Sequence, residues 1–146
     1  MTGINKVRVW LGALAAFVVW AVLDYVINMM VLGPHYEAAQ QQGHFLAAPR
    51  YGAFIPIWML MLFALSAVIA HLYAAARATC GAGPRTAAAI GLKVGFAAGF
   101  PTNFALATWA AFDRIFPLWW MIEMWAGAVV AALVAGWIYR DSTARA

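Results

Sequence analysis

Residues 9–32 read VWLGALAAFVVWAVLDYVINMMVL, and this stretch decides the fold class. A helix rises about 1.5 Å per residue and a bilayer core is about 30 Å thick, so roughly 20 apolar residues are needed to cross it. The stretch is long enough to do so even with some tilt. It therefore predicts an integral membrane protein.

Two polar residues, Asp24 and Asn28, interrupt this apolar stretch. They are four residues apart and so share one face of a helix, which Phe17 and Trp20 continue toward the N-terminus. An acidic side chain inside a membrane costs about 2.5–3.5 kcal/mol on insertion scales, so it should face other protein groups. The pattern predicts an inward stripe that is apolar in its first half and polar in its second.

Composition supports a single transmembrane domain over residues 1–146. The chain is 66% hydrophobic and 10% charged, whereas soluble domains are about 45–50% apolar and about 25% charged. The net charge of +4 is small, and in this setting it indicates membrane orientation and lipid headgroups rather than nucleic acid. The single cysteine, Cys80, excludes an internal disulfide.

The apolar runs predict an all-α fold with four transmembrane helices in an antiparallel up-down-up-down bundle, because their connections are short. The predicted spans are residues 9–32, 51–73, 87–112 and 118–139. Gly33-Pro34 should end the first span. A short surface helix is expected to start at Pro34.

The basic residues predict which side of the membrane each end occupies. Six of them fall on the side of the two termini, and two fall on the other side: Lys6, Arg8, Arg77, Arg85, Arg140 and Arg145 against Arg50 and Arg114. By the positive-inside rule, both termini should lie in the cytoplasm.

At this orientation four polar residues fall in the outer half of the membrane: Asp24, Asn28, Asn103 and Glu123. Two nearby buried carboxyls cannot both ionise cheaply, so a proton or a cation should balance them. Arg50 and Arg114 are candidate counter-charges. The group can be a structural hydrogen-bonded network, a site for a proton, ion or small ligand, or a metal or catalytic site.

Small residues step by four along the last two spans. Gly91, Gly95 and Gly99 lead to Asn103, and Glu123 leads to Gly127 and Ala131. Small residues let membrane helices approach closely. We expect the two spans to form a close hairpin with Asn103 near Glu123, although the same faces could dock another subunit.

Other candidate sites carry weaker patterns. His35, His44 and Glu37 lie in the outer connection and are weak candidates for a metal site, so no metal is expected. Common nucleotide, zinc-protease and serine-hydrolase motifs are absent from the sequence. The sequence therefore predicts no cofactor and no catalytic residue.

A resemblance adds to this picture. Leu23-Asp24-Tyr25, Tyr36, the glycine-rich third span and the ending Gly136-Trp137-Ile138-Tyr139 are similar to a group of small four-span bacterial inner-membrane proteins. The resemblance implies a four-span fold and a location in the inner, cytoplasmic membrane of a bacterium, and it brings no catalytic residues.

Three functions follow from these patterns. The first is a non-catalytic helical subunit, an accessory part of a larger membrane complex or a homo-oligomer, whose partners are lipid, other membrane subunits or itself. The second is a small proton, ion or small-molecule transporter that uses the outer-half carboxyls. The third is a membrane enzyme acting on a lipid or quinone, which requires a water-accessible cleft beside Glu123.

Overall fold

The computed structural model describes residues 4–141, and this part of the chain is all-α, without a strand. Its elements are α1 (Lys6–Tyr25), the π-helix η1 (Val26–Val31), α2 (Gly33–Gln41), α3 (Phe54–Cys80), α4 (Pro84–Trp109) and α5 (Ile115–Ile138). The all-α prediction is confirmed. Arg145, which the orientation argument used, lies outside the described residues.

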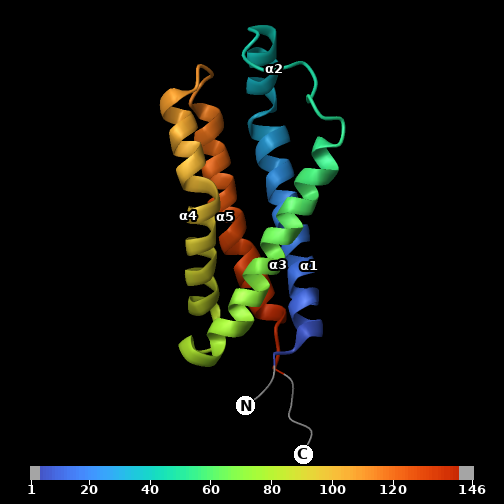
Figure 1. The fold of residues 1–146 in the computed structure, drawn as a ribbon, viewed down its shortest axis with the longest axis vertical. Coiled ribbons are helices and arrows are strands. Elements are labelled where there is room, and N and C mark those ends of the chain that lie inside the picture. Colours follow the sequence, from blue (N-terminus) through green and yellow to red (C-terminus); the bar gives the residue numbers. More distant parts are fainter. Residues whose placement is uncertain (1–3, 142–146) are drawn as a thin grey trace, which may run out of the picture.

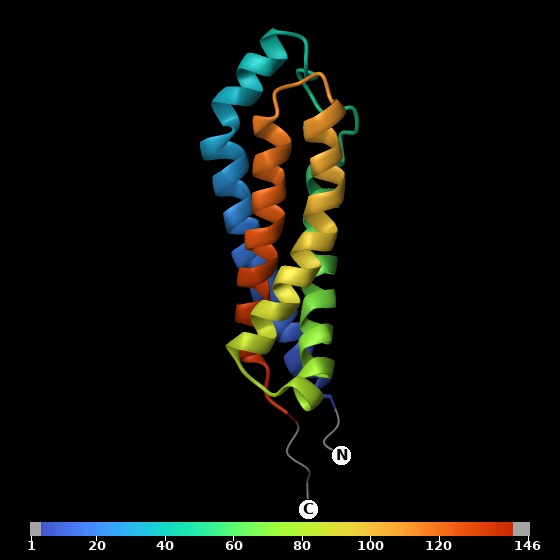
Figure 2. The ribbon, with the colours of Figure 1, turned by 90° about the vertical axis from the view of Figure 1, so that its left-hand side faces the viewer.

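The four long helices stand side by side and alternate in direction (Figure 1). The helix α5 packs against both α1 and α4, while α3 crosses α1, and Figure 2 shows α5 between these two neighbours. The helix α2 extends beyond the others at one end, which we call the α2 end. At the opposite end the two chain ends meet, where the Asn5 backbone N–H donates to the Tyr139 hydroxyl over 3.1 Å.

Three segments are long and apolar enough to cross a membrane: Lys6–Val31, Phe54–Cys80 and Ile115–Ile138. They correspond to three of the four predicted spans. The helix α4, at the place of the predicted span 87–112, is not among them, and Lys93, Pro101 and Asn103 lower its mean hydropathy. The structure thus supports a membrane protein with three clear candidate spans.

Two helices begin at other residues than the predicted spans, and the positions of their prolines are consistent with these starts. The predicted spans 51–73 and 118–139 begin at residue 54 and residue 115 instead. Pro56 and Pro117 then lie in the first turns of their helices, where the missing N–H has no partner within the helix anyway. The helix α3 also continues to Cys80, because nothing in its last two turns stops it before Gly81.

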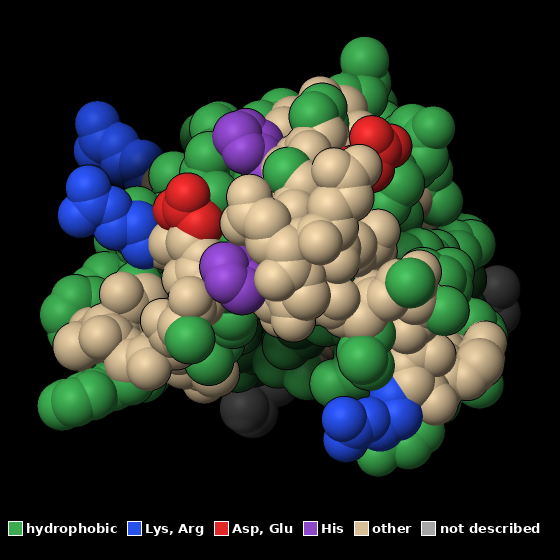
Figure 3. Space-filling view, turned by 90° about the horizontal axis from the view of Figure 1, so that it is seen from above, with side chains coloured by type: hydrophobic (Ala, Val, Ile, Leu, Met, Phe, Trp, Pro, Cys, Tyr) green, Lys and Arg blue, Asp and Glu red, His purple; other side chains and the backbone are tan. Residues whose placement is uncertain are grey.

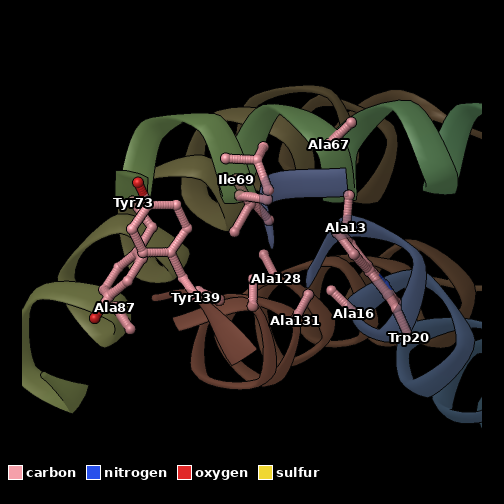
Figure 4. Packing of buried hydrophobic residues seen from close by; sticks show 14 of the residues in the cluster. Ala13, Ala16, Trp20, Ala67, Ile69, Tyr73, Ala87, Ala128, Ala131 and Tyr139 are labelled. Atoms are coloured by element: carbon pink, nitrogen blue, oxygen red, sulfur yellow. The ribbon is translucent and has the colours of Figure 1, made fainter. Parts of the chain in front are cut away.

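The core is built from small side chains. One face of α1, with Val9, Ala13 and Ala16, is buried against α5, where Ala128 and Ala131 are fully buried. Figure 4 shows these alanines between the helices, with Tyr73 and Tyr139 beyond them, whose rings meet edge to face. Because alanine and glycine leave little space between backbones, the helices approach closely: a Cβ at Gly12 would lie 3.3 Å from the Ala135 carbonyl oxygen.

The outer surface has the opposite pattern. Large apolar side chains such as Val22, Met30, Leu60 and Trp137 are exposed along the sides of the helices. Seen from the α2 end, Lys, Arg, Asp, Glu and His side chains occupy separate points of the surface (Figure 3). Apolar sides with polar ends are what a bilayer requires of a protein that spans it.

Candidate functional site

Asp24 is the first of two buried carboxyls at the α2 end of the molecule. Its side chain is 7% exposed, and it lies on the α1 face that the sequence predicts to be inward. Its Oδ1 accepts a hydrogen bond from Asn28 Nδ2 and another from Trp58 Nε1, each 3.1 Å long. Donors from two different segments therefore hold this carboxyl in one orientation.

The π-helix η1 places Asn28. In this segment the backbone bonds reach five residues back, as shown by the Leu32 N–H donating to the Ile27 carbonyl over 2.9 Å. The Asn28 side chain also donates to the Asp24 backbone carbonyl, at 3.1 Å. The Asn28 amide thus donates at the point where the backbone hydrogen bonds change from the α to the π pattern. Short π-helical segments of this kind are frequent at functional sites.

Tyr36 extends the network from α2. Its hydroxyl donates to Asn28 Oδ1 over 3.0 Å and accepts from Trp120 Nε1 over 2.7 Å. Burial raises the pKa of the Tyr36 phenol above its usual range. The phenol therefore stays protonated at neutral pH and keeps its role as the donor to Asn28.

Glu123 is the second buried carboxyl, only 1% exposed. Its Oε1 accepts a hydrogen bond from Trp20 Nε1 over 2.7 Å, which links α5 to α1. Gly127, one turn further along α5, makes room for this pair, because a Cβ there would overlap the Trp20 indole ring. The glycine at this position thus serves the Trp20–Glu123 contact rather than the contact with α4.

A cavity of about 890 Å³ brings the polar groups together at the α2 end. Both carboxyls line it, and so do nine further side chains able to form hydrogen bonds: Asn28, Tyr36, Gln40, Arg50, Tyr51, Trp58, Thr102, Asn103 and Trp120. The rest of the lining is mostly apolar and includes methionines and phenylalanines. Its volume falls within the roughly 300–1,000 Å³ of known ligand pockets.

The predicted site and packing residues of the last two spans lie in three different surroundings. Asn103 also lines the cavity, but its Nδ2 donates to the Gly99 carbonyl of its own helix over 2.7 Å. Gly91, Gly95 and Gly99 face α5, where a Cβ at Gly95 would lie 2.8 Å from Trp125 Cα. Ala131 is buried in the core shared with α1.

The two candidate counter-charges lie in different places. Arg50 is exposed and lines the cavity, whereas Arg114 caps the start of α5 and is not part of the lining. Within residues 4–141 the ion pair joins Arg77 to Asp141 over 3.0 Å, at the opposite end of the molecule. Neither arginine is therefore paired with Asp24 or Glu123 in the described part of the chain.

The metal candidates do not converge. His35, Glu37 and His44 are exposed on α2 and on the connection after it. In the described part of the chain, no three His, Cys, Asp or Glu side chains are grouped so that they could hold a metal ion.

Sequence reasoning missed the aromatic donors. Trp20 was placed on the inward face of the first span, but its bond to Glu123 was not expected. Trp58 and Trp120 carried no distinguishing signal, since the chain has eight tryptophans. The useful signal is general: a carboxyl buried in a membrane needs donors, and the indole N–H is the donor that apolar helices carry.

Comparison of the chain with family models, with curated proteins and with solved structures finds no match.

Proposed function

We propose that this protein binds a small amphipathic molecule, which enters the cavity at the α2 end from the membrane. The observation that carries the proposal is the cavity itself, about 890 Å³ in volume with two buried carboxyls in its wall. An apolar pocket with a few convergent polar groups is the usual form of a small-molecule site. Ionisable groups inside a membrane protein are also more often functional than structural.

The cavity lining supports a ligand that arrives from the hydrocarbon rather than from water. Exposed apolar side chains of η1 and α3 belong to it, among them Met29, Phe54, Ile55 and Met61. An apolar ligand body could contact these side chains while its polar head reaches the carboxyls. The proposal therefore requires a molecule with both parts.

The proposal includes α4 as a fourth membrane span, which completes an antiparallel bundle with both chain ends in the cytoplasm. Two observations support this assignment. The glycines of α4 face α5, while Leu92, Phe96 and Phe104 are exposed on its outer side. Phe100 stacks between the two phenylalanines, with ring centroids 4.9 Å and 5.6 Å away, in an apolar strip suited to lipid.

The structure gives different degrees of support to the other functions predicted from the sequence. The accessory-subunit hypothesis relied on the glycine faces as docking surfaces, but Gly91, Gly95 and Gly99 pack inside the chain. That hypothesis stays a prediction without this support. Transport would use the same cavity as its binding site, and the enzyme hypothesis, which requires a cleft beside Glu123, also stays a prediction.

The test compares two neighbouring alanines of α4. Ala98 lines the cavity, whereas Ala97 is exposed and is not part of the lining. The protein is purified from membranes in mild detergent, extracted with organic solvent, and the extract is analysed by mass spectrometry. We expect a small molecule near one per chain in the wild type and in Ala97→Phe, and its loss in Ala98→Phe.

The outcome decides between two cases. Loss of the molecule in Ala98→Phe alone supports binding in the cavity, because the added ring fills that space. Extracts that contain only bulk lipid in the same proportions for all three proteins would contradict the proposal.

A further inference from the structure

Most hydrogen-bond donors of the buried part of the cavity are already used within the protein. Trp58 donates to Asp24, Trp120 donates to Tyr36, and Tyr36 donates to Asn28. Both Asn28 amide hydrogens go to Asp24, one to its carboxyl and one to its backbone carbonyl. Asn103, which is half-buried, donates to the Gly99 carbonyl and keeps one amide hydrogen free, and the other free donors of the lining belong to exposed residues, namely Gln40, Arg50, Tyr51 and Thr102.

The acceptors of the same region are not used up. One oxygen of each carboxyl accepts the bonds from indole and amide donors, and within residues 4–141 no partner contacts the other oxygen, Asp24 Oδ2 or Glu123 Oε2. Both side chains are more than nine-tenths buried and both line the cavity. The buried part of the wall thus has free acceptors and few free donors, so an occupant that brings donors suits it.

The charge of the two carboxyls also favours an occupant that brings hydrogen-bond donors. Two carboxyls in a poorly solvated space are expensive unless protons or a cation neutralise them. Of the lysine and arginine side chains in the described part, Arg50 lines the cavity, but it is exposed and makes no ion pair there with either carboxyl. Where protons do not neutralise the carboxyls, the balancing positive charge has to come from the occupant.

The aromatic rings of the lining could also contact a bound cation. Aromatic rings come from α2, from the connection after it, and from α3 and α5: Tyr36, Phe45, Tyr51, Phe54, Trp58 and Trp120. The face of an aromatic ring attracts a nearby cation, most strongly where water is excluded. A site lined by both carboxyl oxygens and aromatic rings is complementary to an ammonium group that carries an apolar body.

From these observations we propose that the occupant is a small organic cation with an apolar body, whose ammonium group binds the free oxygens of Asp24 and Glu123. This inference rests on the proposed function and adds the chemical class of the ligand. It disfavours an anion, which both carboxyls would repel. It also disfavours a neutral carbonyl-headed ring, which would find few donors in the buried part of the cavity.

The experiment uses three probes that share one apolar body and differ in the head group: 4-phenylbutylamine, 4-phenylbutan-1-ol and 4-phenylbutyrate. At pH 7 they are a cation, a neutral alcohol and an anion. Their binding to the purified full-length chain in detergent micelles is measured by isothermal titration calorimetry, with empty micelles as the blank. We expect the amine to bind at least about tenfold more tightly than the alcohol, since hydrogen bonds to charged groups are the stronger ones.

Two conservative variants test the carboxyls. Asp24→Asn and Glu123→Gln keep the oxygen that accepts from Trp58 or Trp20 and remove the charge. Each should weaken amine binding about tenfold and leave alcohol binding within about twofold. Glu37→Gln removes an exposed carboxyl of α2 outside the cavity, and this control should change neither affinity.

The outcomes separate the inference from the function beneath it. If the alcohol binds as tightly as the amine, the cavity binds ligands and the cation inference is wrong. An amine preference that survives both variants also overturns it. If none of the three probes binds, the inference is wrong, and the solvent extraction of Ala98→Phe then decides separately on the proposed function.

Discussion

The contact between Trp20 and Glu123 shows how a single residue can stabilise this protein and still remain available to a ligand. One Glu123 oxygen accepts the buried indole N–H from α1, and the other has no partner within residues 4–141. The first oxygen therefore has a structural role, because a buried indole N–H without an acceptor is costly. The second is free for an occupant of the cavity.

This division of roles predicts different effects for two substitutions at one position. Glu123→Gln keeps an oxygen that accepts from Trp20, so we expect the melting temperature in detergent to stay within about 2 °C of the wild type. Glu123→Leu leaves the Trp20 N–H unpaired, at a cost of about 1–3 kcal/mol, and should lower the melting temperature by roughly 5 °C.

The control is Trp20→Phe combined with Glu123→Leu. Because this double variant lacks the Trp20 N–H that Glu123→Leu leaves without an acceptor, it should recover part of the stability lost in Glu123→Leu alone. Equal melting temperatures for the Gln and Leu variants would show that the hydrogen bond does not stabilise the fold.

At the scale of helices, two different devices build the wall of the cavity. The glycines of α4 bring it against α5, which leaves α3 as the helix on the other side of the cavity. The π-helix η1 widens the end of the first span and aims Asn28 back at Asp24. Both devices are local backbone features, and both determine where distant side chains meet.

The contact between α4 and α5 predicts that Gly95→Ala destabilises the protein. The added Cβ would lie 2.8 Å from Trp125 Cα and 3.0 Å from Ala128 Cβ, so one helix must shift. Overpacking of this kind costs about 1–3 kcal/mol. Thermal unfolding followed by circular dichroism in detergent measures the loss.

Gly52→Ala is the matched control, since a Cβ there meets no atom within 4 Å and the residue lies outside the helices. We expect its melting temperature to equal that of the wild type. If Gly95→Ala were as stable as Gly52→Ala, the close packing of α4 on α5 would be contradicted.

At the scale of the whole molecule, the open question is how many times the chain crosses the membrane. Three segments meet the requirements of length and hydropathy, and α4 does not. If α4 crosses, the connection between α4 and α5 lies on the same side as the α2 end. If it does not cross, that connection lies on the side of Cys80.

Labelling with a membrane-impermeant maleimide in sealed vesicles distinguishes these topologies. Cys80, the single cysteine and an exposed one, should react only from the cytoplasmic side. In a Cys80→Ser background, Gln42→Cys should react only from the outer side. Ala111→Cys, in the connection before α5, should react like Gln42→Cys if the fourth span exists, and labelling from the cytoplasmic side would exclude it.

The sequence by itself determined the class of the protein and the inward face of its first span. Length and hydropathy are sums over neighbouring residues, so they predict helices and a membrane location without any tertiary information. The spacing of Trp20, Asp24 and Asn28 predicted their shared face for the same reason, since helical periodicity is local. The sequence also showed that the acids needed partners.

Only the tertiary structure decided which groups those partners are. Trp20 and Glu123 are 103 residues apart, and Trp120 and Tyr36 are 84 apart, so no local pattern links them. Gly127 faces Trp20 rather than α4 because of how α1 packs on α5. The cavity is likewise a property of all the helices together, since its volume depends on the spacing between helices and not on the composition of any one of them.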